Sequence, residues 1–359
     1  MSEQDHFYGG QAVLEGVMMR SQDAYATAVR RADGSIIVGT RQLNTFSQRY
    51  RWAQWPLIRG NVTLLDSLTL GLESLNFSGN VALEDEARQR APEQAATQAR
   101  EQAREVAAHD AEAAKSLGEK ALWATMLPAL ALGVGLFVLL PAWAVDWVLG
   151  TQEATVRAAF GQVVLRNLVE GLIRLLVIVG YIAGISLIPY IRRVFQYHGA
   201  EHATINAYED TGEVSVQAAL HHSPLHPRCG TAFLLVVIVV KILVNCFLGW
   251  PTLWLRLLLR LAVLPPIAGI AYEVIRWAGR HRHSLLSAML AWPGLLLQKL
   301  TTRQPDEHQV EVAIYALATV APDVDLPPGF AEPERVGIGS GGRIVRDTQA
   351  GVRAIATSG

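Results

Sequence analysis

Residues 121–145 read ALWATMLPALALGVGLFVLLPAWAV and carry no charged side chain. A helix rises 1.5 Å per residue, so a segment of this length can cross a hydrocarbon core of about 30 Å. The segment therefore predicts a transmembrane helix. It places the chain in the class of mainly α, integral membrane proteins.

Three further apolar segments follow the first. They cover residues 163–191, whose cleanest part is 175–191, then 232–248 and 253–277. Pro265-Pro266 must kink the last of them, because proline removes a helical hydrogen bond. Tryptophans cluster near the predicted ends, as expected at the headgroup layer. We expect four transmembrane helices within residues 121–277.

The overall composition supports this class and excludes another. Only 18% of the residues are charged, against roughly 25% in soluble domains. The formal net charge is −1, whereas nucleic-acid binding needs clustered excess cations. We therefore expect no nucleic-acid partner. The two cysteines cannot build a disulfide framework, and the polar start of the sequence does not resemble a signal peptide.

The N-terminal region, residues 1–83, predicts a small α+β domain. Asp33-Gly34 lies between two short apolar runs, residues 24–29 and 35–39. This dipeptide favours a tight turn, so the runs predict a β-hairpin. Leucines in residues 56–75 recur with helical spacing. That helix would pack on the hairpin or lie in the membrane interface.

Three regions that flank the apolar segments differ in amino-acid composition. Residues 84–120 are rich in Ala, Glu, Gln and Arg and predict a charged helical segment. Residues 278–321 predict an ordered helical region, with a helix at 306–317. Residues 322–359 are dominated by Pro and Gly, and we expect a mobile tail.

Cations give the expected orientation. They gather before the first apolar segment, after the second and after the fourth, at Lys115, Lys120, Arg192, Arg193, Arg276, Arg280 and Arg282. Positive flanks stay in the cytoplasm. Both termini and the histidine-rich loop 192–230 are therefore expected on the cytoplasmic side, with membrane lipids as partners.

The sharpest chemical signal is YHGAEH at residues 197–202. His198 and His202 stand four residues apart, so on a helix both imidazoles face the same way and can reach one metal ion. Glu201 lies between them, like the general base of H-x-x-E-H metalloproteases. The alternative is that both histidines are polar groups at the membrane surface or at a helix cap.

The rest of the same loop favours the metal interpretation. Five of the ten histidines fall between residues 198 and 226. Glu209, His226 or Cys229 could supply a third ligand, and the sequence does not choose among them. A divalent ion, most simply Zn²⁺, suits this set, while Fe²⁺ and Mn²⁺ are also compatible. Alternatively, HPRCGT at 226–231 is only a turn that leads into the third apolar segment.

Charges also occur within the apolar segments. Arg166, Glu170 and Arg174 recur every four residues, and Glu273 is a candidate partner for Lys241. Charges inside a membrane are usually paired or face an aqueous cavity. Structural ion pairs and a transport path are both open. A glycine-rich segment at residues 9–20, GGQAVLEGVMMR, predicts a tight turn leading into a strand.

Several motifs together resemble one family. GGQAVLEGVMMR, YHGAEH and HPRCGT occur with PLIRG at 56–60, INAYE at 205–209 and PGLLLQKLTT at 293–302. In this order they resemble the YqhQ-like family of bacterial membrane proteins, an uncharacterised family described as predicted metal-dependent enzymes. The resemblance implies that the shared motifs contain His198, Glu201, His202, Glu209, His226 and Cys229. Ala203 and Gln304 depart from the family pattern.

These observations favour a metal-dependent enzyme of hydrolytic chemistry in the bacterial inner membrane. His198 and His202 would bind the metal, Glu201 would act as general base, and Glu209, His226 or Cys229 would complete the ligand set. A peptide or a lipid-linked molecule would suit a site at the membrane face. The alternatives are a membrane scaffold or regulator and a transporter component, with a homo-oligomer or another membrane protein as partner.

Overall fold

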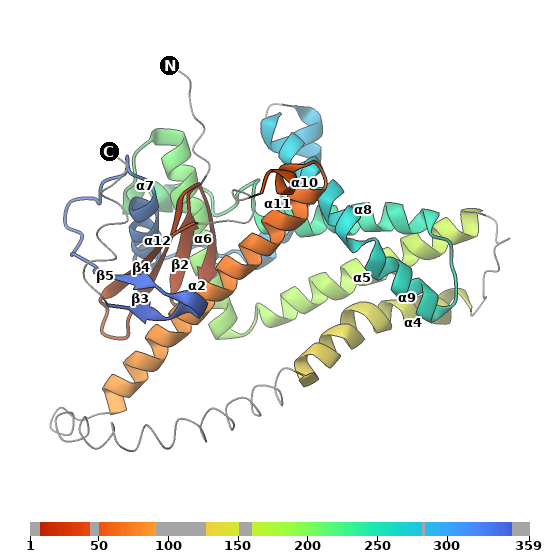
Figure 1. Cartoon of the computed structure of the whole chain (residues 1–359), viewed down its shortest axis with the longest axis horizontal. Coiled ribbons are helices and arrows are strands. Elements are labelled where there is room, and N and C mark those ends of the chain that lie inside the picture. Colours follow the sequence, from red (N-terminus) through yellow and green to blue (C-terminus); the bar gives the residue numbers. More distant parts are fainter. Residues whose placement is uncertain (1–7, 44–49, 91–126, 151–159, 282–283, 347–359) are drawn as a thin grey trace. The chain divides into compact units, whose positions relative to one another are not determined.

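The computed structural model describes residues 8–43, 50–90, 127–150, 160–281 and 284–346. The chain divides into two compact units. The sheet unit comprises Met1–Ala82, Ile182–Val244 and Leu257–Gly359, and the helical unit comprises Leu83–Tyr181 and Asn245–Arg256. Figure 1 shows the elements of both.

A six-stranded sheet organises the sheet unit, in the order β1-β2-β3-β4-β5-β6. Neighbouring strands are antiparallel, except that β4 and β5 are parallel. The strands are β1 (Gly9–Val13), β2 (Gly16–Arg20), β3 (Ala24–Arg30), β4 (Ile36–Gln42), β5 (Glu334–Ile338) and β6 (Ile344–Val345).

The predicted hairpin is confirmed as β3 and β4. Gly34 has a φ of 87°, which glycine adopts without steric cost. Ser35 donates its backbone N–H to Asp33 Oδ1 at 2.9 Å, which closes the turn locally. The strands then pair in register from Arg30–Ile36 to Ala24–Gln42.

The expected mobile tail requires correction over its first part. Residues 334–338 form β5, which pairs with β4, and Val336 and Ile338 are buried in the core. Only these two alternating apolar positions marked the strand, and they stand among glycine and proline. Residues 347–359 lie outside the described residues.

Helices cover both faces of the sheet (Figure 1). The helices α6 (Pro189–Thr211) and α12 (Glu307–Val320) pack on one face, where Tyr197 and Leu317 join a core with Val17 and Val38. The helix α2 (Ile58–Arg90) covers the other face through Phe77. Successive strand residues point to opposite faces, so the alternating apolar residues supply both cores.

The expected helix at 306–317 is confirmed as α12. Asp306 accepts from the Gln309 backbone N–H at 2.8 Å, and Gln309 Oε1 accepts from the Asp306 N–H at 2.9 Å. This reciprocal capping satisfies two amide groups that a helix start otherwise leaves without partners. The helix therefore begins where its sequence predicts and extends to Val320.

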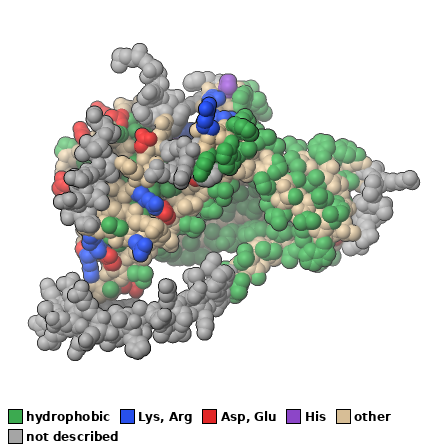
Figure 2. Space-filling view, viewed as in Figure 1, with side chains coloured by type: hydrophobic (Ala, Val, Ile, Leu, Met, Phe, Trp, Pro, Cys, Tyr) green, Lys and Arg blue, Asp and Glu red, His purple; other side chains and the backbone are tan. Residues whose placement is uncertain are grey.

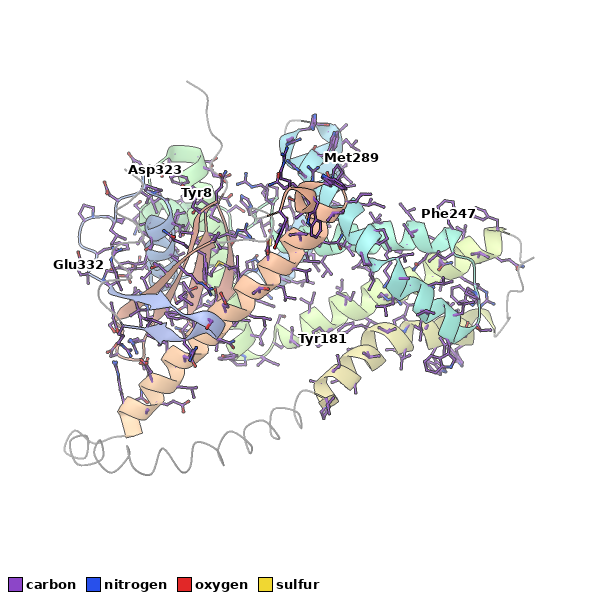
Figure 3. All side chains as sticks on the ribbon, viewed as in Figure 1. Tyr8, Tyr181, Phe247, Met289, Asp323 and Glu332 are labelled. Carbon is purple, nitrogen blue, oxygen red and sulfur yellow. The ribbon has the colours of Figure 1, made fainter. Side chains whose placement is uncertain are left out.

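Aromatic contacts hold α6 within this unit. The rings of Tyr8 and Tyr208 meet edge to face, with centroids 5.4 Å apart. Tyr208 donates to Asp323 Oδ2 at 2.5 Å, and Figure 3 labels Tyr8 and Asp323. The start of β1 and the segment after α12 are thereby tied to the end of α6.

The second expected span ends earlier than predicted. The helix α5 (Phe160–Ile185) ends before Pro189, which opens α6. Proline disfavours helical geometry in the residue before it and suits the first turn of a new helix. Residues 189–191 therefore belong to the helix that carries the histidine pair.

Three helices within the described residues are long and apolar enough to cross a membrane: Leu127–Leu149, Phe160–Ile185 and Gly230–Phe247. The first contains the π-helical turn η2 (Gly135–Leu139) and α4 (Leu140–Leu149), and the third is α8. Residues 121–126 of the first expected span lie outside the described residues.

The fourth expected span is a bent pair. The helices α9 (Leu253–Ala262) and α10 (Leu264–Arg280) meet at 45°, so the described helices offer up to four spans if the pair counts as one. The break falls immediately before Pro265-Pro266, where the sequence predicts a kink. Figure 2 shows hydrophobic side chains over the visible surface of the helical unit.

The three charged residues of α5 that recur every four positions have partners in the helical unit. Arg174 Nη2 lies 2.7 Å from Glu170 Oε1, one helical turn away. Arg166 donates to the carbonyl oxygens of Leu149 and Gly150. These contacts give Arg166, Glu170 and Arg174 partners within the unit, as expected of charges in apolar segments.

Glu273 has a different partner from the one expected. In the sheet unit it accepts from Arg59 Nε at 2.6 Å. The remaining described elements are η1 (Arg51–Gln54), α7 (Val216–His221), α11 (Leu285–Thr301) and η3 (Ser340–Gly342).

Candidate metal centre

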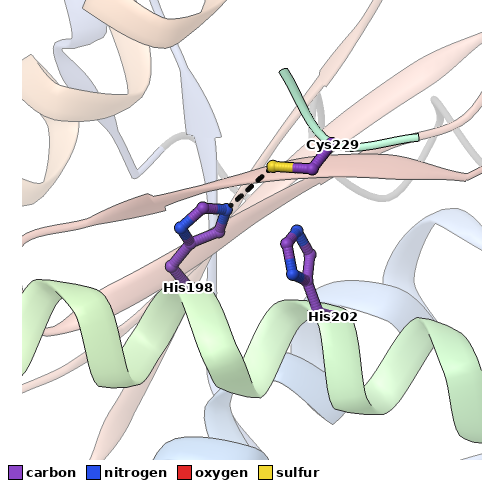
Figure 4. Close-up of side chains that lie close together, drawn as sticks. All are labelled: His198, His202 and Cys229. Atoms are coloured by element: carbon purple, nitrogen blue, oxygen red, sulfur yellow. Dashed lines mark hydrogen bonds between the residues drawn. The ribbon is translucent and has the colours of Figure 1, made fainter. Parts of the chain in front are cut away.

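The helix α6 presents the histidine pair on one side. The ring centroids of His198 and His202 lie 4.4 Å apart, with an angle of 60° between the ring planes. Both rings project from α6 toward Cys229 (Figure 4). The spacing of four residues produces this common direction, as the sequence predicts.

Cys229 comes to the pair from the segment immediately before α8. Its Sγ lies 3.3 Å from His198 Nε2, and the ligand atoms of His198, His202 and Cys229 all lie within 4.8 Å of one another. Donors bonded to a tetrahedral zinc ion at its usual bond lengths lie roughly 3.3–3.7 Å apart. A small side-chain adjustment would therefore bring all three to one ion.

Backbone carbonyls orient the two imidazoles. His198 Nδ1 lies 2.9 Å from the Thr301 carbonyl oxygen, and His202 Nδ1 lies 2.8 Å from that of Pro224. A carbonyl oxygen only accepts, so Nδ1 must carry the proton in each ring. This leaves Nε2 with its lone pair for a ligand, the arrangement that metal-binding histidines adopt. Burial lowers the pKa of His202, which favours its neutral form.

Glu201 lies beside the pair and is buried. Its carboxylate accepts a backbone hydrogen bond from Gly10 of β1, while its Oε2 has no hydrogen-bond partner among the described residues. Burial raises the pKa of the Glu201 carboxyl, and His198 and His226 oppose that shift. An oxygen buried without a hydrogen-bond partner is costly, and a bound water molecule, ion or substrate could remove that cost.

The glycine-rich segment at 9–20 explains how Glu201 fits. A Cβ on Gly10 would lie 2.9 Å from the Glu201 Cδ, so only glycine allows β1 this close to α6. Further along the segment, Glu15 Oε1 accepts from Arg193 Nε at 2.5 Å and Glu15 Oε2 accepts from the Tyr197 hydroxyl at 3.1 Å. The segment therefore positions α6.

A cavity of about 650 Å³ opens onto these groups. It lies within the sheet unit, and its walls include His198, Glu201, His202, His226 and Cys229. Gly10 and Arg20 come from the strands on its other side. The volume falls in the range of small-molecule sites, so a substrate could reach the three donors and the carboxylate.

His226 and Glu209 lie next to the three donors but outside that group. His226 Nδ1 accepts from the Arg228 N–H at 3.3 Å, and Arg228 Nη2 lies 3.5 Å from His226 Nε2. That nitrogen lies 3.8 Å from Glu209 Oε2, and Glu209 also pairs with Arg228. Of the three candidates for the third ligand, the structure therefore brings Cys229 to the histidine pair.

Three positioning residues had no chemical signal of their own in the sequence. Gln298 clamps the His226 backbone by accepting from its N–H and donating to its carbonyl oxygen, both at 2.8 Å. Thr301 and Pro224 supply the carbonyls that orient the histidines. Gln298 and Thr301 belong to PGLLLQKLTT, so the motif was visible although its role was not.

Two other loop histidines lie away from the centre. His221 Nδ1 contacts the Gln217 carbonyl oxygen at 2.7 Å, and His222 Nδ1 contacts that of Ala218 at 2.6 Å. Each binds a carbonyl one turn earlier in the chain. Local clustering of histidines in the sequence therefore overstated the number of candidate ligands.

Comparisons with known proteins agree on the family. The chain matches the family model described as Protein of unknown function (DUF1385) over residues 55–323. It is 34% identical over 314 residues to the Uncharacterized protein YqhQ of Bacillus subtilis (strain 168), which covers 86% of this chain and 90% of that protein. No solved structure matches at a significant level. The chain therefore belongs to the DUF1385 family, and its predicted resemblance to YqhQ is confirmed.

Proposed function

We propose that the protein is a metal-dependent membrane enzyme of hydrolytic type. The observation that carries the proposal is the convergence of two Nδ1-anchored histidines and one thiol within 4.8 Å. Two imidazoles and a thiolate suit Zn²⁺. Three protein ligands leave a fourth position free, as in catalytic rather than structural zinc sites.

Each side chain has a distinct role in this proposal. His198, His202 and Cys229 hold the ion, which when bound supplies Lewis acidity toward a water molecule or a carbonyl group. Glu201 accepts a proton through its Oε2, which has no hydrogen-bond partner in the part of the chain that the structure describes. His226 and Glu209 form a second layer, in which the pair with Arg228 holds Glu209 in place.

Metal analysis of the purified full-length chain tests this function. We expect about one zinc per chain in the wild type and less than a tenth of that in His202→Ala and Cys229→Ala, because each change removes one of three ligands. His221→Ala, in the same loop but outside the group, is the matched control and should keep the metal. A wild-type chain that takes up no divalent metal would contradict the proposal.

One observation favours a second candidate, a cysteine nucleophile. Cys229 Sγ lies within reach of His198 Nε2, and Thr301 orients the far side of that ring. A nucleophile, a base and an orienting group form the general pattern of covalent catalysis. Metal-free protein in which iodoacetamide modifies Cys229 much faster than Cys246, with His198→Ala slowing that reaction, would favour this candidate.

We also propose that the protein spans the inner membrane with its site on the cytoplasmic side. Arg192 and Arg193 open the helix that bears the histidines, and positive flanks stay inside. An alkaline phosphatase reporter, which works only outside the cytoplasm, should be inactive after Gly212 and active after Gly150. The reverse pattern would contradict this orientation.

A further inference from the structure

A second cavity lies beside the metal centre. It has a volume of about 450 Å³, within the range of ligand pockets, and α8, α10 and α11 of the sheet unit contribute its walls. It shares His226, Arg228 and Ile275 with the cavity that holds the three donors. The two spaces therefore adjoin, and two of the three residues at their boundary are polar.

The wall is apolar over most of its surface. Its side chains include Ala232, Val236, Ile275, Ala291, Trp292 and Leu295. The wall helix α8 is apolar enough to cross a membrane, and α10 forms half of the bent candidate span. A pocket built from such helices suits a hydrocarbon chain, because burying apolar surface away from water is favourable.

One end of the pocket is polar. Asn206, Glu209, His226 and Arg228 line this end. Glu209 pairs with Arg228 there, and His226 faces both groups. A ligand that fills the apolar part would thus place its polar end at the boundary with the metal cavity.

A buried hydroxyl gives independent evidence for a ligand. Ser287 is 4% exposed, lines this pocket, and its Oγ has no hydrogen-bond partner among the described residues. A buried hydroxyl without a partner loses its hydrogen bonds to water and gains none in return. An oxygen atom of a bound ligand would satisfy it.

We propose that this pocket binds the acyl chain of a lipid-like amphiphile, with the polar end of that molecule directed to Arg228 and the metal cavity. A peptide suits the pocket less well, because every backbone amide and carbonyl group of a bound peptide needs a partner. The proposal that the pocket binds an acyl chain does not depend on the proposed function. The further assignment of an acyl ester as the substrate rests on the proposed function.

Binding of a fluorescent fatty acid to the full-length chain in nanodiscs tests the pocket. We expect saturable binding that falls at least tenfold in Ala291→Trp, because the indole would intrude into the cavity and obstruct the acyl chain. Ser287→Ala should weaken binding about 2- to 10-fold. Leu286→Trp is the matched control. Leu286 lies on the same helix as Ala291, is 53% exposed and does not line the pocket. This variant should therefore bind the fatty acid as the wild type does. Met289, also exposed, marks this helix in Figure 3.

Competition identifies the ligand class. A single-chain phospholipid and an unlabelled fatty acid should both displace the probe, and the tighter competitor shows whether a phosphate or a carboxylate headgroup fits. An apolar peptide should not displace it. Unchanged binding by Ala291→Trp, or equal displacement by the peptide, would overturn the proposal.

Two further measurements separate this proposal from the metal function. His202→Ala should bind the fatty acid normally, because it lacks only a metal ligand. The wild type should hydrolyse p-nitrophenyl decanoate more efficiently than the acetate, and Ala291→Trp should lose that preference. Normal binding of the fatty acid without any ester hydrolysis would refute the proposed function but would not contradict the acyl-chain pocket. Acetate hydrolysis without chain binding would refute the pocket alone.

Discussion

Replacing Glu201 by glutamine is expected to lower the metal-dependent rate of ester hydrolysis by about 100- to 10,000-fold, the usual contribution of a positioned general base. The change preserves size and shape but removes the ability to accept a proton. Because His198, His202 and Cys229 are untouched, the metal content should stay at the wild-type level. The expected signature is therefore loss of rate without loss of metal.

The structure also predicts what glutamine does to the fold. Burial raises the pKa of the Glu201 carboxyl, which means that its charged form is disfavoured in this position. A neutral amide avoids the cost of burying a charge, and it can still accept the hydrogen bond from the Gly10 backbone. The free energy of unfolding should therefore be maintained or raised.

Hydrolysis of p-nitrophenyl acetate by the zinc-loaded, full-length chain measures this effect, because a small ester does not depend on the acyl pocket. Glu213→Gln is the matched control, since Glu213 is exposed and lies in the segment that immediately follows α6. Equal rates for Glu201→Gln and the control would show that Glu201 only supports the contact with β1. A parallel loss of metal would assign it to the ligand set instead.

Replacing Gly199 by alanine is expected to lower the free energy of unfolding by about 3 kcal/mol, the upper part of the range for overpacking. Gly199 lies between His198 and Ala200 on the buried side of α6, and a Cβ there would overlap the Arg303 carbonyl oxygen. That oxygen cannot move freely, because the Arg303 backbone N–H donates to the Phe195 carbonyl oxygen of the same helix at 2.9 Å.

Gly79→Ala provides the matched control for this substitution. Gly79 also lies inside a helix, α2, but a Cβ there would meet nothing within 4 Å. Alanine should stabilise that helix by about 0.5–1 kcal/mol. Unfolding of both variants in denaturant, followed by far-UV circular dichroism, would show opposite signs. A Gly199→Ala variant within 0.5 kcal/mol of the wild type would contradict the close contact.

The Gly199 contact also connects stability to the metal centre. The segment that ends at Arg303 carries Thr301, whose carbonyl oxygen orients His198. A displaced segment would release that ring, so Gly199→Ala should also lower zinc occupancy, whereas Gly79→Ala should not. No local feature of the sequence around Gly199 indicates this link, because its partner lies about a hundred residues later.

Features of the site that depend on residues close in sequence can be predicted, whereas features that depend on distant segments cannot. The common direction of His198 and His202 depends only on helical periodicity, which four residues suffice to define. The choice of Cys229 over Glu209 and His226 depends on how a loop returns to α6. Glu209 was the nearest candidate in sequence, yet Arg228 holds it outside the group.

The sequence by itself determined what local periodicity and local caps control: the apolar helices, the hairpin at Gly34, the start of α12 at Asp306 and the shared face of the two histidines. Tertiary structure alone decided which donor joins them, why Gly10 must lack a side chain, that Arg59 pairs with Glu273 and that residues 334–338 complete the sheet. Those outcomes arise from contacts between segments far apart in the chain, where packing and hydrogen-bond geometry select one partner among several that composition leaves equivalent.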